Sequence, residues 1–153
     1  MDVATAIWGG IAGTIALIAV YGGFLATRLT RLDLVRFQGH AISQERSSLV
    51  YVYGTILQFA LATAFSIGYY YIFKQIDSAT YAGWGALLGL ANGVLVAAVL
   101  LPLLGLADRG VREGTVQQPG IGGIRYGRLT PVAIIAAYLV FGVWVGLFVL
   151  PSA

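Results

Sequence analysis

The chain has 153 residues, of which 59% are hydrophobic and only 10% are charged, and its formal net charge is +3. Soluble domains carry about 25% charged residues, and a chain of this length cannot bury so much apolar surface in its own core. The composition therefore excludes a water-soluble enzyme and a disordered chain. The absence of cysteine also excludes a secreted module held together by disulfides.

Four long stretches contain no Asp, Glu, Lys, Arg or His, namely residues 3–27, 47–73, 78–107 and 129–153. About 20 apolar residues in a helix cross the roughly 30 Å hydrocarbon layer, so each stretch can hold one spanning helix. A helix satisfies its own backbone polar groups, which lipid cannot do, and the alternating pattern of a membrane barrel is absent. We therefore predict an all-α membrane protein, a four-transmembrane-helix bundle in a single transmembrane domain over residues 1–153, with helices at about 5–27, 49–73, 81–106 and 131–149.

The segments between these helices carry most of the charge. Eight of the nine Lys and Arg residues lie in the predicted loops 28–48 and 107–130, and the ninth is Lys74. Because basic residues concentrate in cytoplasmic loops, we expect both loops in the cytoplasm and both termini outside. The first helix has no basic segment before it and is too long for a secretory signal, so we expect it to be retained. These features predict a multi-pass protein of the inner (cytoplasmic) membrane.

The sequence also contains a candidate internal repeat. The pattern W-G-x-x-x-G occurs at Trp8–Gly13 and again at Trp84–Gly89, 76 residues later. The first and third predicted helices run in the same direction, as do the second and fourth. This arrangement predicts a tandem repeat of two helical hairpins. The alternative is that Gly and Trp recur by chance in glycine-rich membrane helices.

Small residues recur at four-residue spacing in every predicted helix. In lipid, helices gain little by hiding apolar surface from one another, so they associate through close backbone approach. The third helix has the longest row of small residues, and we expect it to lie centrally in the bundle. Some of these faces could instead contact another protein. The residues predicted to pack helices together are Gly9, Gly13, Gly85, Gly89, Gly93, Gly142 and Gly146.

Within the predicted helix cores there is no acid or base. A charge at membrane depth is costly and is kept for a function, so its absence argues against an ion-coupled transporter. The notable polar residues there are Gln58, Asn92 and Tyr138. Either they line a polar cavity for a solute, or they bond neighbouring helices, which contributes about 0.6 kcal/mol each. Pro102 is expected to kink the third helix.

The two basic loops contain no recognisable catalytic or metal-binding set. His40 has no Cys or clustered acids beside it. The turn Pro119–Gly123 lacks the preceding strand and the Gly-Lys-Ser/Thr of a phosphate-binding loop. We therefore expect no catalytic residue, metal or cofactor. The first loop, with apolar residues between arginines, is expected to lie along the inner membrane surface. Arginines attract lipid phosphates, and the predicted headgroup contacts are Arg28, Arg31, Arg36, Arg109, Arg112, Arg125 and Arg128.

Four glycine-rich segments carry a resemblance: Gly9–Thr14, Leu101–Gly105, Pro119–Gly122 and Tyr138–Gly146. Together they resemble a family of small glycine-rich four-helix prokaryotic integral membrane proteins of unassigned function. The resemblance spans most of the chain and implies a four-helix membrane protein without indicating an activity. Members of that family often have His at the positions of Gln58 and Tyr138. This chain departs from that pattern, so a metal or proton role does not carry over.

The sequence predicts a non-enzymatic polytopic membrane protein. The first hypothesis is a structural or accessory subunit of a membrane complex, or a small homo-oligomer. Its partners would then be membrane lipids and either other membrane protein subunits or further copies of itself, with no nucleic acid. One alternative is a small passive channel or carrier for a neutral or weakly polar solute. A further alternative is a membrane organiser that binds anionic lipids.

Overall fold

The computed structural model describes residues 3–43, 48–76 and 81–149. Over these residues the chain is helical and contains no strand. Four helical stretches are long and apolar enough to span a membrane: α1 (Val3–Ala26), α3 (Leu49–Phe73), the continuous stretch Tyr81–Ala107, and α7 (Thr130–Phe148). This confirms the prediction of an all-helical fold with four helices that are long and apolar enough to span a membrane.

The observed helix bounds follow the uncharged stretches of the sequence. The predicted range 49–73 coincides with α3, and the other three ranges differ from the observed ones by at most two residues at either end. The third span is divided into α4 (Tyr81–Leu95), a π-helical turn η1 (Val96–Leu100) and α5 (Leu101–Ala107). Pro102 has no N–H group and its ring would clash with a carbonyl in a regular α-helix. The widened turn lies directly before it, so the helix passes Pro102 without ending.

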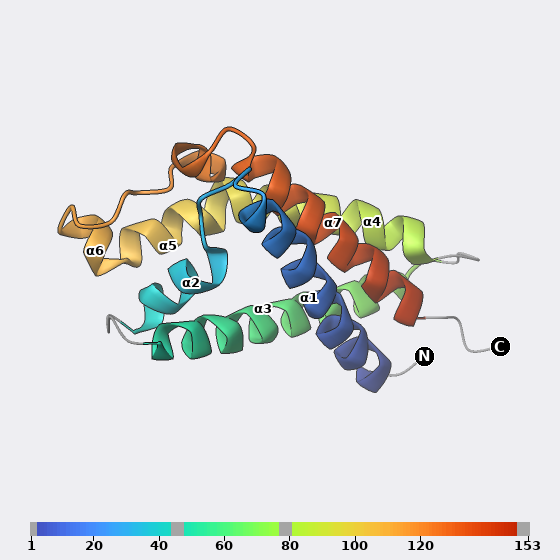
Figure 1. Ribbon diagram of the computed structural model, residues 1–153. Helices are drawn as coiled ribbons and strands as arrows, with labels where there is room; N and C mark the ends of the chain where they lie inside the picture. Colours follow the sequence, from blue (N-terminus) through green and yellow to red (C-terminus); the bar gives the residue numbers. More distant parts are fainter. Residues whose placement is uncertain (1–2, 44–47, 77–80, 150–153) are drawn as a thin grey trace.

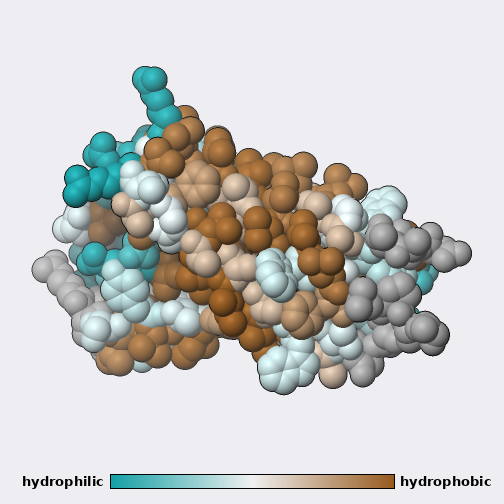
Figure 2. Space-filling view, turned by 45° about the vertical axis from the view of Figure 1, so that its right-hand side comes forward, coloured by the Kyte–Doolittle hydropathy of each residue, from teal (hydrophilic) through white to brown (hydrophobic). Residues whose placement is uncertain are grey.

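The two ends of the bundle differ in content. The beginning of α1 and the end of α7 lie at one end, whereas α2 (Leu34–Ile42), α6 (Arg109–Arg112) and the 3₁₀ segment η2 (Ile121–Tyr126) gather at the other (Figure 1). Figure 2 shows hydrophilic side chains at this second end and hydrophobic side chains over the body of the helices. A surface of this kind, apolar in its middle and polar at one end, suits a bilayer.

α1 and α7 are the central helices of the bundle. α7 packs along α4 on one side and along α1 on the other, and α1 also packs against α3. α3 and α4 therefore form the outer helices of the row. The expectation that the third span lies centrally is wrong, because its long row of glycines serves a single neighbour, α7. A helix face made of small residues lets one neighbouring helix approach closely, but it does not bring further helices into contact.

Glycines bring α7 close to the helices on both of its sides. A Cβ atom on Gly85 would overlap the carbonyl oxygen of Gly142, and a Cβ on Gly13 would lie 2.8 Å from Cδ2 of Phe141. α7 thus lies between the glycine faces of α1 and α4, the two helices that carry the W-G-x-x-x-G pattern. All seven glycines selected for helix packing are buried, and close backbone approach of this kind multiplies dispersion contacts.

Part of the first loop folds into the short helix α2. The Asp33 side chain caps this helix by accepting a hydrogen bond from the Arg36 N–H at 3.0 Å. A Cβ on Gly39 of α2 would overlap the carbonyl oxygen of Val50, and one on Gly54 of α3 would overlap that of Val35. α2 therefore packs against α3 through two glycines and buries its apolar face in protein.

Candidate functional site

Five polar side chains from four helices are buried inside the bundle and are termed the polar cluster. They come from α2, α3, α4 and α7, and none is more than 6% exposed: Gln38, Gln58, Tyr69, Asn92 and Tyr138. The α3 members lie on its inward face, where buried residues recur every three or four positions. The three polar residues selected from the sequence thus lie inside the protein, together with two that were not selected.

Contacts within the polar cluster link its members in pairs. Gln38 Nε2 donates a hydrogen bond to Gln58 Oε1 at 2.8 Å, which ties α2 to the middle of α3. On its other side Gln58 interacts with the Tyr138 side chain of α7. Tyr69 lies next to Asn92 of α4. The rings of Tyr69 and Tyr138 both pack edge-on against Phe141, with centroids 6.0 and 6.3 Å away.

Several atoms of the polar cluster form no hydrogen bond of good geometry, although Gln58 lies against Tyr138 and Tyr69 lies against Asn92. Among the described residues, four of its buried atoms have no hydrogen-bond partner: Gln38 Oε1, Gln58 Nε2, Tyr69 Oη and Asn92 Nδ2. A buried polar group without a partner costs about 1–3 kcal/mol. The four atoms include both donors and acceptors, which are the groups that a small polar molecule needs as partners.

Other buried polar residues are already satisfied by the helices themselves. The Thr14 hydroxyl donates to the Gly10 carbonyl within α1 at 2.6 Å. The Ser66 hydroxyl donates to the Ala6 carbonyl at 2.6 Å and so bonds α3 to α1. Buried hydroxyls outside the polar cluster thus find hydrogen-bond partners on the helix backbone.

A second feature, termed the basic cavity, lies beside α2 at the loop end of the bundle. Its volume is about 380 Å³. Its walls come from α2 and the residues before it, from the segment 115–117 and from η2. The polar residues that line it include Arg31, Asp33, Arg36, His40, Gln117 and Tyr126.

Hydrogen bonds between distant segments hold the walls of the basic cavity. The Arg31 N–H donates to the Tyr126 carbonyl at 3.0 Å, and the Tyr126 hydroxyl donates to the Gln117 carbonyl at 2.6 Å. Burial, and after it the charge of Asp108, raises the pKa of Tyr126, so this phenol stays protonated and remains a donor. These two hydrogen bonds therefore join Tyr126 to Arg31, ahead of α2, and to Gln117 in the segment 115–117.

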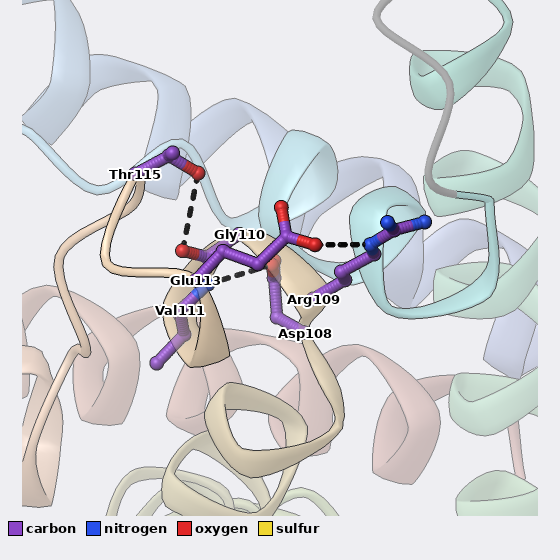
Figure 3. A network of polar contacts seen from close by, with 6 residues as sticks. All are labelled: Asp108, Arg109, Gly110, Val111, Glu113 and Thr115. Carbon is purple, nitrogen blue, oxygen red and sulfur yellow. Dashed lines mark hydrogen bonds and ion pairs between the residues drawn. The ribbon is translucent and has the colours of Figure 1, made fainter.

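The remaining wall is shaped by α6 and the turn after it. Figure 3 shows the contacts: Asp108 Oδ1 accepts from the Val111 N–H at 3.2 Å, the Thr115 hydroxyl donates to the Gly110 carbonyl at 3.2 Å, and Arg109 forms an ion pair with Glu113. These bonds place Thr115 in the wall of the basic cavity and of a smaller adjoining pocket of about 190 Å³.

The seven arginines predicted as headgroup contacts differ in their surroundings in the structure. All seven selected as headgroup contacts are exposed at the loop end. Arg31 and Arg36 line the basic cavity, and Arg109 lines the adjoining pocket. His40, which the sequence presented as an ordinary loop residue, lines both. These residues share a cavity because the segment 115–117 and η2 lie against α2. No local sequence pattern indicates that contact.

Within residues 3–43, 48–76 and 81–149, no group of three or more His, Cys, Asp or Glu side chains could hold a metal ion. The two features that remain are therefore an uncharged polar cluster inside the bundle and a basic cavity at its loop end. Comparison with protein-family models, curated proteins and solved structures finds no match to this chain.

Proposed function

We propose that this protein is a non-catalytic passive channel or carrier for a small, neutral, polar solute. The observation that carries this proposal is the set of four buried polar atoms without partners in the polar cluster. A bundle that used these side chains only to bond its helices would gain by pairing them. Leaving them unpaired is explained if a solute pairs with them during passage.

The composition of the polar cluster argues for an uncharged solute. Its members are amides and phenols, with no acid or base to neutralise a charge. An unpaired charge in this environment would be strongly unfavourable. Amides offer both donors and acceptors, so the favoured solutes are small alcohols and amides such as glycerol and urea.

Two features support access to the polar cluster from the side of the bundle that α2 covers. Gln38 belongs to α2 at the loop end, so its bond to Gln58 leads from that end toward the middle of the bundle. Gln58 also lines a mainly apolar pocket of about 190 Å³ between α1, α2 and α3, together with Leu17, Tyr21 and Tyr51. Small movements of α2 against α3 would open the cluster from this side.

We further propose that the protein lies in the cytoplasmic membrane with the α2 end inside and both termini outside. Support comes from the arginines, eight of the nine Lys and Arg residues being in the two segments at that end. The duplication of a helical hairpin is also retained as a proposal. In both copies of the W-G-x-x-x-G pattern the tryptophan is exposed and the two glycines are buried.

The test is solute flux in liposomes that contain the purified protein. Swelling is followed by stopped-flow light scattering with glycerol and with urea. We expect faster entry than in empty liposomes, and loss of that gain in the double variant Gln58→Leu, Asn92→Leu. The matched control is Gln75→Leu, which makes the same amide-to-leucine change at an exposed position just after α3.

Thermal unfolding in detergent establishes that each variant is folded before its flux is compared. Flux no faster than in empty liposomes, or flux unchanged in the double variant, would overturn the proposal. Gln58 and Asn92 would then serve only to bond helices, at about 0.6 kcal/mol each. A large particle of defined stoichiometry after mild extraction, combined with no flux, would support the accessory-subunit hypothesis instead.

A further inference from the structure

The basic cavity carries an inference that is independent of the proposed solute path. Arg31 and Arg36 lie on the segments that enter and form α2, and both residues line this cavity together with His40. In the part of the chain that the structure describes, the ion pair is Arg109–Glu113, so neither of these two arginines is paired with an acid there. Two arginines thus line one cavity without an ion pair to any acid of residues 3–43, 48–76 and 81–149.

The acid that lines the same cavity is already engaged in structure. Asp33 Oδ1 accepts the Arg36 N–H at 3.0 Å, and Oδ2 accepts the Tyr51 hydroxyl at 2.9 Å. Asp33 therefore holds the first turn of α2 against α3, and the Arg36 side chain lies beside the same Tyr51 hydroxyl. Asp108, in the adjoining pocket, caps α6 through Oδ1, while its buried Oδ2 has no hydrogen-bond partner among the described residues. The basic cavity accordingly retains an excess of positive charge.

The rest of the lining suits a polar molecule attached to an anion. Gln117 and Thr115 are polar and uncharged, while Leu32, Phe37 and Val116 supply apolar surface. The volume of about 380 Å³ lies within the range of roughly 300–1,000 Å³ that is usual for small-molecule sites. Guanidinium groups match phosphate oxygens through paired hydrogen bonds, which makes arginine the preferred residue for this anion.

We infer that the basic cavity binds the phosphate group of a small phosphorylated alcohol, through the side chains of Arg31 and Arg36. The same chemistry is present in a soluble ester such as glycerol 3-phosphate and in the headgroup of an anionic lipid such as phosphatidylglycerol. The residues that line the cavity belong to the loop end. That hydrophilic end adjoins the apolar body of the bundle (Figure 2), so either ligand could reach it.

The test compares two pairs of substitutions that remove the same charge. One is Arg31→Gln with Arg36→Gln. The control is Arg125→Gln with Arg128→Gln, at exposed positions of the same end that do not line this cavity. The protein is placed in nanodiscs of phosphatidylcholine, and glycerol 3-phosphate and inorganic phosphate are titrated by calorimetry. A second set of nanodiscs also contains phosphatidylglycerol, and native mass spectrometry counts the lipid retained.

We expect saturable binding that the cavity pair weakens by about tenfold or more and the control pair leaves within about twofold. Binding of glycerol 3-phosphate identifies a soluble ligand, and selective retention of phosphatidylglycerol identifies a lipid headgroup; either supports the inference. Equal loss in both pairs would overturn it by showing diffuse attraction to net charge, and so would a lack of saturable binding in both settings.

A conservative pair keeps the test decisive if the glutamine variants do not fold. Arg31→Lys with Arg36→Lys retains both charges but loses the planar fork that pairs with phosphate. Weaker binding in this pair, with an unchanged unfolding midpoint, supports the site, whereas unchanged binding contradicts it. Solute flux measured on the same samples distinguishes failure of this inference from failure of the proposed carrier function.

Discussion

The carbonyl oxygen of Gly142 lies directly against Gly85, and the carbonyl oxygen of Gly85 lies directly against Gly142. This reciprocal contact leaves no room for a methyl group on either residue. It holds the backbones of α4 and α7 closer together than side chains would allow. The close pairing of these two helices therefore requires glycine at both positions, as it does at Gly89 and Gly146.

Substituting Gly142→Ala tests that dependence. The added methyl group would meet backbone atoms of α4 on a crowded face, and we expect a loss of about 1–3 kcal/mol in the free energy of unfolding. The measurement is reversible unfolding in mixed micelles as the SDS fraction rises. Gly83→Ala is the control because a Cβ there meets open space. It should be neutral or stabilising by up to about 1 kcal/mol through helix propensity; equal losses in the two variants would contradict the packing described here.

The contact between α2 and α3 makes a second prediction. A methyl group in Gly39→Ala would overlap the Val50 carbonyl, so we expect α2 to separate from α3. Amide hydrogen exchange in residues 34–42 should then accelerate, while exchange in α7 stays unchanged. Gly68→Ala, at an open position on α3, is the matched control. Unaltered exchange in α2 of the Gly39 variant would show that this helix is held by other means.

Tyr126 makes a prediction about pH. Its pKa is raised above the ordinary phenol value of about 10 by burial and by Asp108, so folding favours the neutral phenol. The stabilisation it provides is complete below pH 10 and is lost as the pH rises through the folded-state pKa. Tyr126→Phe also loses the hydrogen bond to the Gln117 carbonyl, which costs about 1 kcal/mol at neutral pH.

The measurement is the difference in unfolding free energy between wild type and Tyr126→Phe from pH 7 to 11. We expect this difference to be constant up to about pH 9 and to narrow above about pH 10. A difference that widens at high pH would show that the phenolate, rather than the phenol, is preferred in the folded state.

The spanning helices could be predicted because their signal is local and strong. An uncharged run of sufficient length specifies a helix in lipid wherever its partners lie, and α3 was predicted at both ends. The order of the helices was not predictable in the same way. The glycine row of the third span indicated close packing, but its single partner is decided by the shape of α7. That shape depends on Gly142 and Gly146, which are distant in sequence.

The sequence indicated only some of the residues that form the polar cluster and the basic cavity. Gln58, Asn92 and Tyr138 stood out because amides and phenols are uncommon in apolar helices. Gln38 did not, since it lay in an expected surface loop. Its role depends on α2, whose signals were the capping Asp33 and the paired apolar residues that follow. Arg31 and Arg36 could not be separated from the other arginines, because their cavity is completed by segments about 80 residues away in the chain.

The position of α7 between the glycine faces of α1 and α4 has a consequence for biogenesis. α7 follows the other spanning helices in the chain, so it is synthesised after them. Until it enters the bilayer, α4 lacks the helix that its glycines fit, and α1 has only α3 beside it. We therefore expect the first three long helices to reach their final packing only after α7 has been made and lies between α1 and α4.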